Sequence, residues 1–254
     1  MKRFLVLLTF MFSVVVYGQQ VMLMLDVETK SQSSFKMAAD QWFKAVETHA
    51  GETPDMYSYQ IQGSRDMRML QWFDSKKAMV EHMDKMDAIE PKVQETLSKM
   101  DPMPEEDWNN FSSSTDFREA SVWEHQPELS TMDGWNALSD EEKLEMKYRR
   151  VQYFSVDFNN EEAFEDWRKK INALDKELGI QMHMVVYRSV FGAKDKDYMV
   201  ILIDKSRFDY HKNWSARMEK RQASDTFRSM INNGAAAWAA NGEENWVRVN
   251  EMTY

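Results

Sequence analysis

The chain has 254 residues, of which 43% are hydrophobic, 13% aromatic and 29% charged. This composition is typical of a globular protein and excludes an intrinsically disordered chain. The formal net charge is −10 at pH 7, and no cluster of Lys and Arg is present. Nucleic acid and anionic membrane surfaces are therefore excluded as partners, because phosphate binding needs such clusters. The chain has no cysteine, which excludes disulfides, thiolate metal ligands and thiol nucleophiles.

The first twenty residues have the pattern of a secretory signal. Lys2 and Arg3 precede an apolar run over residues 4–17, and a small residue, Gly18, follows where a signal peptidase would cut. We therefore predict a signal peptide at 1–20 and export to the periplasm or the extracellular space; an uncleaved N-terminal anchor is the alternative. After cleavage no run of membrane-spanning length remains, so we expect no membrane association.

Two parts of the mature chain repeat the same order of patterns. Each begins with an apolar run that ends in Asp, and continues with an amphipathic helix, a hairpin, a second helix and a last strand. The Asp that ends the first strand and the Asp that ends the hairpin are 48 residues apart in the first copy and 47 in the second. These residues are Asp26 and Asp74, then Asp157 and Asp204. At strand ends they can cap the helix or turn that follows.

The first copy is predicted to cover residues 21–125. Pro91 cannot donate a hydrogen bond inside a helix, so we expect the second helix to break there. In chain order the predicted elements are a strand at 21–27, a helix around 35–46, strands at 55–64 and 67–74, a helix from 75 and a strand at 118–125.

The second copy is predicted to cover residues 149–254, after a linker at 126–148. Ser139 and Glu142 have the spacing of a capping box, which predicts a short helix within the linker. In chain order the elements of the second copy are a strand at 151–158, a helix around 164–178, strands at 181–192 and 197–204, a helix from 206 with a further helical stretch at 227–238, and a strand at 245–254.

The order βαββαβ, written twice, predicts an α+β fold of two tandem ferredoxin-like units. Apolar residues on both faces of the runs at 21–27 and 151–158 indicate that each sheet is covered on both sides. This arrangement resembles the dimeric α/β-barrel superfamily, which includes antibiotic-biosynthesis-type monooxygenases, haem-degrading enzymes and stress-responsive barrel proteins. The resemblance implies that the two units pack sheet to sheet as an intramolecular barrel. It carries no family catalytic motif, so it implies no particular activity.

None of the five histidines has metal-ligand spacing, and the catalytic residues are unknown. His82 and His211 occupy equivalent places on the second helices of the two copies. Barrel relatives that bind haem take an axial histidine from a helix, so the resemblance makes this pair haem-ligand candidates. We favour the simpler interpretation that they are half-buried helix residues retained after duplication, and we predict no metal and no cofactor.

Methionine is unusually frequent, with 21 residues. Several methionines occur in pairs two positions apart, which places both thioethers on one face of a strand. Soft sulfur ligands suit Cu(I). Methionine is also a flexible filler of protein cores, and these pairs fall on predicted core strands. We therefore predict that they are buried for packing, with copper binding as the alternative. The pairs are Met22 and Met24, Met67 and Met69, and Met182 and Met184.

The favoured function is a non-enzymatic exported protein that binds a small apolar or aromatic ligand, or a protein partner, through the barrel. A cofactor-independent monooxygenase or a haem-handling enzyme of the barrel type is the alternative. Polar and aromatic residues on the strands that would face the space between the sheets are the candidate ligand-binding residues. These are His183, Gln152, Gln60, Tyr187 and Trp72. The oligomeric state is left open.

Overall fold

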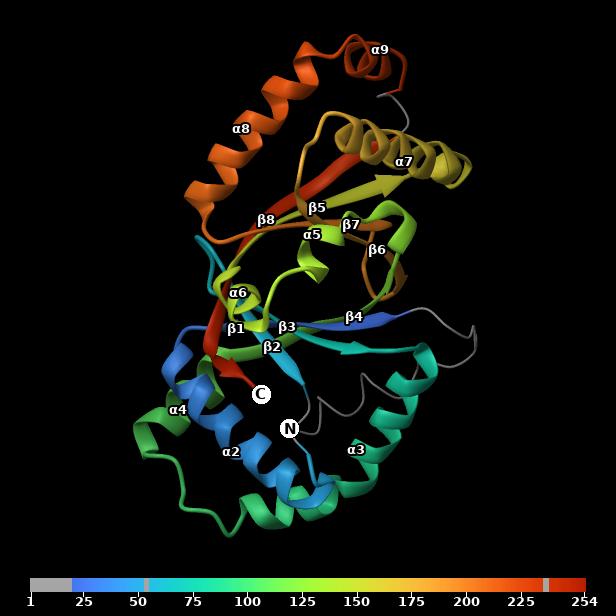
Figure 1. The fold of residues 1–254 in the computed structure, drawn as a ribbon. Coiled ribbons are helices and arrows are strands. Elements are labelled where there is room, and N and C mark those ends of the chain that lie inside the picture. The colour runs from blue at the N-terminus through green and yellow to red at the C-terminus, as the bar shows by residue number, and fades with distance from the viewer. Residues whose placement is uncertain (1–19, 53–54, 235–237) are drawn as a thin grey trace. The chain divides into compact units, whose positions relative to one another are not determined.

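The computed structural model describes residues 20–52, 55–234 and 238–254 (Figure 1). The predicted signal peptide lies almost wholly outside these residues. Contacts divide the chain into two units: one up to Glu124 together with Val190–Gly192 and Arg248–Tyr254, the other His125–Ser189 together with Ala193–Val247. The two units are described separately below.

In the first unit, β1 pairs antiparallel with both β3 and β4, and β2 pairs antiparallel with β3. The end of β8 continues this sheet, because Met56 and Tyr254 exchange backbone hydrogen bonds of 2.9 Å. Helices α2 and α3 lie together on one side of these strands (Figure 1). The elements are β1 (Val21–Thr29), α2 (Gln32–Ala50), β2 (Met56–Ile61), β3 (Asp66–Phe73), α3 (Lys76–Leu97), α4 (Glu105–Ser114), β4 (Thr115–His125) and the end of β8 (Trp238–Thr253).

The helices of the first unit begin at serine caps. The side chains of Ser31 and Ser75 accept hydrogen bonds from backbone amides three residues later, which satisfies otherwise unpaired amides in the first turns of α2 and α3. The prediction that the second helix breaks at Pro91 is wrong, since α3 continues through it. Pro91 and Asp87 are both exposed, so water can reach the Asp87 carbonyl that lacks a helical donor.

In the second unit, β5 pairs antiparallel with β7 and β8, and β6 pairs antiparallel with β7. Every residue of β7 is buried, as expected for a strand covered on both faces. The elements are η1 (Pro127–Leu129), α5 (Asp133–Asn136), α6 (Asp140–Glu145), β5 (Tyr148–Val156), η2 (Phe158–Asn160), α7 (Glu161–Glu177), β6 (His183–Phe191), β7 (Tyr198–Asp204), α8 (Arg207–Ala223), α9 (Asp225–Gly234) and most of β8.

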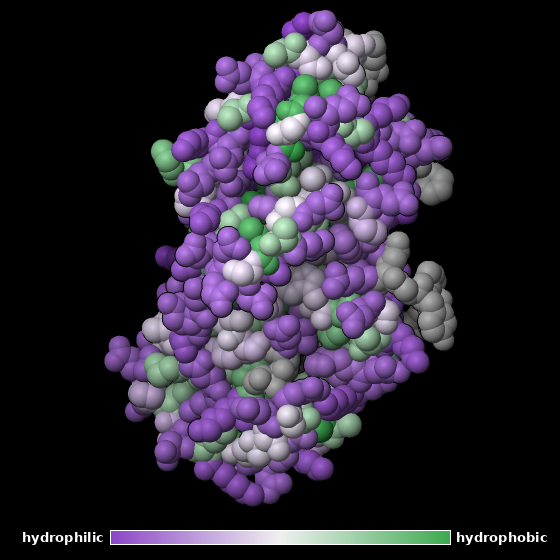
Figure 2. Space-filling view, viewed as in Figure 1, coloured by the Kyte–Doolittle hydropathy of each residue, from purple (hydrophilic) through white to green (hydrophobic). Residues whose placement is uncertain are grey.

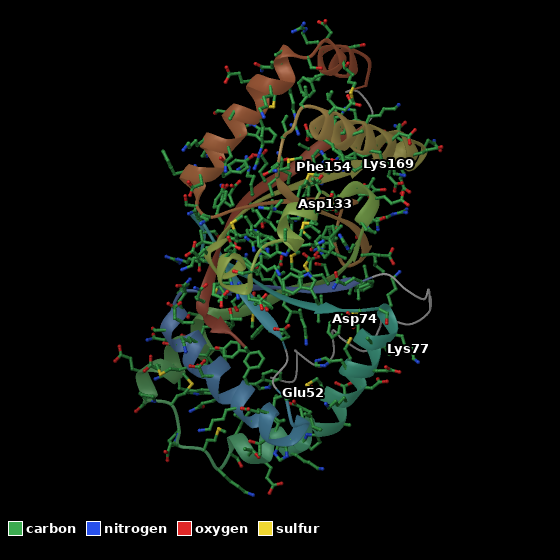
Figure 3. All side chains as sticks on the ribbon, in the orientation of Figure 1. Glu52, Asp74, Lys77, Asp133, Phe154 and Lys169 are labelled. Carbon is green, nitrogen blue, oxygen red and sulfur yellow. The ribbon has the colours of Figure 1, made fainter. Side chains whose placement is uncertain are left out.

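Residues 126–148, predicted as a linker, pack against the second unit. Thr131 forms an isolated antiparallel bridge with Met184 of β6. The Leu129 carbonyl accepts a 2.8 Å hydrogen bond from Asn172 of α7. The predicted capping box of Ser139 and Glu142 is present at the start of α6. This segment therefore contributes to the structure around β6. It begins with η1 and includes α5, whose Asp133 is labelled in Figure 3.

The predicted fold class is confirmed. The strand order is β1-β3-β2-β8-β5-β7-β6-β4, closed into a barrel, and the βαββαβ order occurs twice. One boundary is wrong: the helical stretch expected up to Trp238 ends at Gly234, and Trp238 begins β8. The pairing of β8 with β5 from Trp238 onward explains this difference, because a ladder formed with a distant strand overrides local helical spacing.

The six paired methionines are all buried, as predicted, with exposed fractions between 0% and 5%. Met67 and Met69 pack with Phe35 and Phe43, and Met182 and Met184 pack with the residues of β7. Hydrophilic residues dominate the molecular face in Figure 2. No helix within the described ranges is long and apolar enough to cross a membrane.

Candidate functional site

The second unit contains a cavity of about 480 Å³ beside the ends of β6 and β7. It is bounded by α6, the loop before β6, the last residue of β7 and one face of α8. The volume lies within the range of about 300–1,000 Å³ that is usual for small-molecule sites. Its lining combines apolar and charged side chains: Leu138, Glu142, Met146, Gly179, Ile180, Gln181, Met182, His183, Asp204, Lys205, Asp209, Asn213, Ala216, Arg217 and Lys220.

The junction between β7 and α8 sets the polar wall of the cavity. β7 ends at Asp204, and Ser206 caps α8 by accepting a 3.1 Å hydrogen bond from the Asp209 amide. Residues three and four apart lie on the same face of a helix. Asp209, Asn213 and Arg217 therefore project from one face of α8, toward the end of β7.

Asp204 is the centre of the polar wall and is only 4% exposed. Its Oδ1 accepts a 2.7 Å hydrogen bond from Asn213 Nδ2, and its Oδ2 lies 3.8 Å from Arg217 Nη1. Burial raises the pKa of Asp204, while the Asn213 hydrogen bond and the Arg217 charge oppose that rise. The pair of opposite charges makes the polar wall close to neutral.

Arg217 is held at a second point, because its Nε donates a 3.3 Å hydrogen bond to the Gln181 carbonyl. Its Nη1 and the Oδ2 of Asp204 are buried and have no hydrogen-bond partner among the residues that the structure describes. Buried polar groups are nearly always paired. Both residues line the cavity.

His183 forms the third polar group, at the start of β6. A Cβ atom built on Gly134 would lie 3.0 Å from its Cε1, and the Trp135 ring lies edge-on to the imidazole at 6.0 Å. Its Nδ1 is buried and has no partner in the described part of the chain. Burial lowers the pKa of His183, and the Arg217 and Arg149 charges lower it further against the attraction of Asp204. The imidazole is therefore uncharged at neutral pH.

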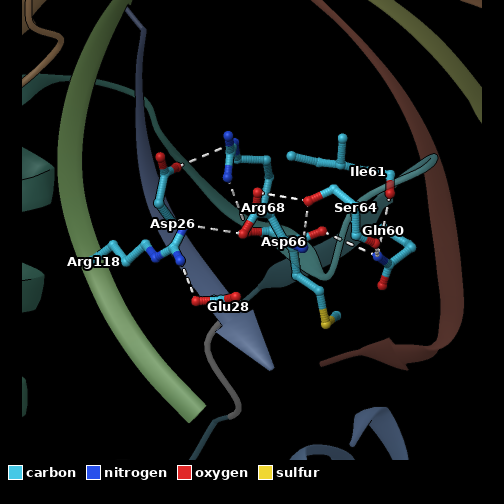
Figure 4. Close-up of polar contacts among 9 residues, drawn as sticks. Asp26, Glu28, Gln60, Ile61, Ser64, Asp66, Arg68 and Arg118 are labelled. Carbon is cyan, nitrogen blue, oxygen red and sulfur yellow. Dashed lines mark hydrogen bonds and ion pairs between the residues drawn. The ribbon is translucent and has the colours of Figure 1, made fainter. Parts of the chain in front are cut away.

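Of the five candidate ligand-binding residues from the sequence, His183 lines the large cavity. Gln60 belongs to the first unit, where its Nε2 donates to the Ser64 and Asp66 carbonyls at 2.8 and 3.2 Å. It thereby closes the β2–β3 turn, as Figure 4 shows. The same view shows the ion pair between Asp26 and Arg68, at 3.2 Å.

The other three candidates have structural contacts. Gln152 donates a 2.9 Å hydrogen bond to Glu243 of β8 and lines a second, much smaller cavity. Tyr187 is buried, with its ring 5.7 Å from that of His125. Trp72, in the first unit, meets the Tyr57 ring edge-on at 5.3 Å. The role of these residues in ligand binding stays a prediction.

Asp204 and Arg217 were not among the candidates. The sequence marked Asp204 only as the repeat equivalent of Asp74, and Arg217 had no motif around it. The one available signal was the position of Asp204 at the end of an otherwise apolar strand, because a carboxylate in such surroundings requires a partner.

The haem-ligand candidates of the sequence do not fit that role. The His82 ring contacts Gln71 through a 3.2 Å hydrogen bond and packs 5.3 Å from the Phe73 ring. His211 is exposed on α8. Neither lines the large cavity. Among the described residues, no three His, Asp or Glu side chains gather as a metal site.

No protein-family model and no curated protein matches the sequence. Solved structures do match. An anthrone oxidase-like protein superposes with a TM-score of 0.51 and 10% identity, over 93% of this chain and 94% of that chain. A putative monooxygenase from Lactobacillus acidophilus superposes with a TM-score of 0.50 and 13% identity, over 91% of this chain and 94% of that chain. The fold is that of the dimeric α/β-barrel proteins. At such identities the likeness establishes the fold alone.

Proposed function

We propose that the protein is exported and binds a small, uncharged organic molecule with an apolar body and one hydroxyl or carbonyl group. The molecule occupies the 480 Å³ cavity of the second unit. The observation that carries this proposal is that three residues lining one cavity each have a buried polar atom without a hydrogen-bond partner among the described residues: His183 Nδ1, Asp204 Oδ2 and Arg217 Nη1.

The charges of the site favour an uncharged ligand. Asp204 and Arg217 offset each other at 3.8 Å, and the lowered pKa of His183 leaves the imidazole neutral. An ionised ligand would add an uncompensated charge to a largely buried wall, which is costly. A hydroxyl group can donate to a carboxylate and accept from a guanidinium at the same time. A ligand hydroxyl can thus satisfy Asp204 and Arg217 together.

The remaining lining suits an apolar body. Leu138, Met146, Ile180 and Met182 contribute aliphatic and thioether surface to the cavity. Small-molecule sites usually combine such surface with a few convergent polar groups. Export rests on the basic start and the apolar run of residues 1–20.

The test is stabilisation of the purified mature protein by neutral and charged probes of similar size. p-Cresol and cyclohexanol should raise the melting temperature with saturation, because a ligand that binds only the folded state stabilises it. Benzoate and benzylamine should have little effect. Stabilisation by the charged probes alone, or by none of the four, would contradict the proposal.

Two substitutions on α8 locate the binding. Ala216 lines the cavity and Ala223, at the end of the same helix, does not; both are exposed. Ala216→Trp should fill the cavity mouth and abolish the response to p-cresol, whereas Ala223→Trp should keep it. An equal response in both variants would place the binding elsewhere.

Cofactor-independent oxidation of a phenolic compound is a second candidate. The supporting observation is His183, which is uncharged at neutral pH and borders the cavity, so its imidazole can accept a phenolic proton. One fold neighbour, an anthrone oxidase-like protein, suggests an anthrone as the first substrate to try. Oxygen consumption with anthrone that is lost in His183→Gln would support oxidation. Binding of p-cresol without oxygen consumption would leave the ligand-binding function alone.

A further inference from the structure

Among the buried charged residues of the second unit, two arginines, one on α7 and one on α8, lie near one carboxylate of α7. Arg168 of α7 is 8% exposed, Arg221 of α8 is 6% exposed and Asp175 of α7 is 1% exposed. Buried charges are stable only when opposite charges and hydrogen bonds compensate them. Two buried guanidinium groups beside one carboxylate leave an excess of one positive charge.

Arg221 uses both oxygens of the single carboxylate. Its Nε lies 2.7 Å from Asp175 Oδ1, and its Nη2 lies 2.5 Å from Asp175 Oδ2. This is the bidentate geometry in which an arginine and a carboxylate pair most strongly. Asp175 is therefore committed to Arg221.

Among the described residues, Arg168 has no comparable partner. Its Nη2 donates to the Met184 sulfur, which is a weak acceptor, and its guanidinium lies 5.5 Å from the Trp167 ring. Its Nε is buried and has no hydrogen-bond partner in the described chain. The pKa of Arg168 is lowered to about 10, first by burial and then by repulsion from Arg221, against the attraction of Asp175.

A small cavity of about 30 Å³ adjoins both arginines, with Gln152 and Trp214 also in its lining. A water-sized occupant needs roughly 10–15 Å³. The cavity therefore has room for a small occupant, such as a water molecule or a single-atom ion.

We propose that this cavity is a binding site for a small monovalent anion of the size of chloride, held between Arg168 and Arg221. The anion supplies the missing negative charge and accepts the hydrogen bond that Arg168 Nε does not make with any described residue. Water would satisfy the donor but would leave the excess charge uncompensated. This site is separate from the larger cavity and does not depend on the function proposed for it.

The test compares sodium chloride, sodium bromide and sodium gluconate at constant ionic strength. Both halides should raise the melting temperature of the wild-type protein with saturation, and gluconate should not. Arg168→Met should abolish the halide dependence. The matched control is Lys169→Met, at the neighbouring exposed position of α7, which should keep it.

A wild-type melting temperature that does not respond to halide, or a response that persists in Arg168→Met, would overturn the proposal. If Arg168→Met does not fold, bromide in wild-type crystals decides the question. An anomalous peak in contact with the Arg168 guanidinium supports the site, and its absence rules the site out. The Ala216→Trp variant should retain the halide response, which separates this result from the test of the larger cavity.

Discussion

Arg217 Nη1 and Asp204 Oδ2 face each other at 3.8 Å across the wall of the large cavity, too far apart for a direct hydrogen bond. The two side chains are otherwise anchored, Asp204 by Asn213 and Arg217 by the Gln181 carbonyl. The gap is therefore held open by the surrounding structure, and the predictions below begin with the coupling across it.

Asp204→Asn and Arg217→Met should each destabilise the protein, because each leaves a buried charge without its counter-charge. We expect a coupling energy of about 0.5–3 kcal/mol between them in a double-mutant cycle measured by urea unfolding. The exposed pair of Lys99 and Glu95 is the control and should show no measurable coupling. Additive effects of Asp204→Asn and Arg217→Met would mean that the charges do not interact across the gap.

Stability should fall as the pH drops below about 6.5, the ordinary histidine value. Burial lowers the pKa of His82, His125 and His183 in the folded protein. The unfolded chain therefore binds more protons in this range, which favours unfolding at lower pH. Each histidine contributes at most about 1.4 kcal/mol per pH unit. Urea unfolding at about pH 7.5 and 5.5 measures the loss.

His183→Gln should make the same pH profile shallower, since it removes one of the three contributions. His211→Gln, at an exposed position of α8, should leave the profile as in the wild type. An unchanged profile in His183→Gln would show that this imidazole does not resist protonation in the folded state.

Gly192→Ala should destabilise the protein strongly. Gly192 has a φ of +78°, and a Cβ atom there would lie 2.2 Å from the Ala120 carbonyl oxygen. The methyl group of alanine is thus disfavoured both by the left-handed backbone and by contact with β4. We expect the free energy of unfolding to fall by more than about 2 kcal/mol. Gly51 has the same φ and open space around its Cβ position, so Gly51→Ala should cost only about 1 kcal/mol. Equal losses in chemical denaturation would show that the contact with β4 can relax.

Met184→Ala should lower the free energy of unfolding by about 2–5 kcal/mol, because it opens a cavity in the core. Met182→Leu and Met184→Leu should each lower it by less than about 1.5 kcal/mol. Both methionines are almost fully buried, at 4% and 1% exposure. Copper titration of the double Met→Leu variant tests the alternative of a thioether site. Tight copper binding in the wild type that disappears in this variant, with stability unchanged, would contradict a packing role.

Exported material should begin near residue 19 or 20. The basic start, the apolar run and Gly18 together predict cleavage at that point. N-terminal sequencing or intact mass of protein from the periplasm or the medium measures the cleavage site. Replacing Leu7 and Leu8 with Arg should abolish export, because it interrupts the apolar run. Material that begins at Met1 would show that the segment is an anchor or remains uncleaved.

The sequence by itself determined the repeated βαββαβ order and most of the core. Strand and helix patterns are local, so the run that ends at Asp204 and the helix that begins near Ser75 were readable without the structure. The first strand was expected to end near Asp26, but β1 continues to Thr29. Burial of the methionine pairs followed from their strand positions. The continuation of α3 through Pro91 was missed, because local rules do not reveal that the Asp87 carbonyl, which lacks a helical donor, faces water.

Only the tertiary structure decided where the site lies. A predicted linker packs along β6 and places Leu138 and Met146 around a cavity, and no local pattern specifies such a contact. Asp204 and Arg217 are 13 positions apart in the sequence. They meet because the turn at Ser206 directs α8 back along the end of β7. Likewise, α7 and α8 place Arg168 and Arg221 beside one carboxylate. Charge compensation depends on which side chains share a buried space, and that is fixed by packing between elements rather than by their order in the chain.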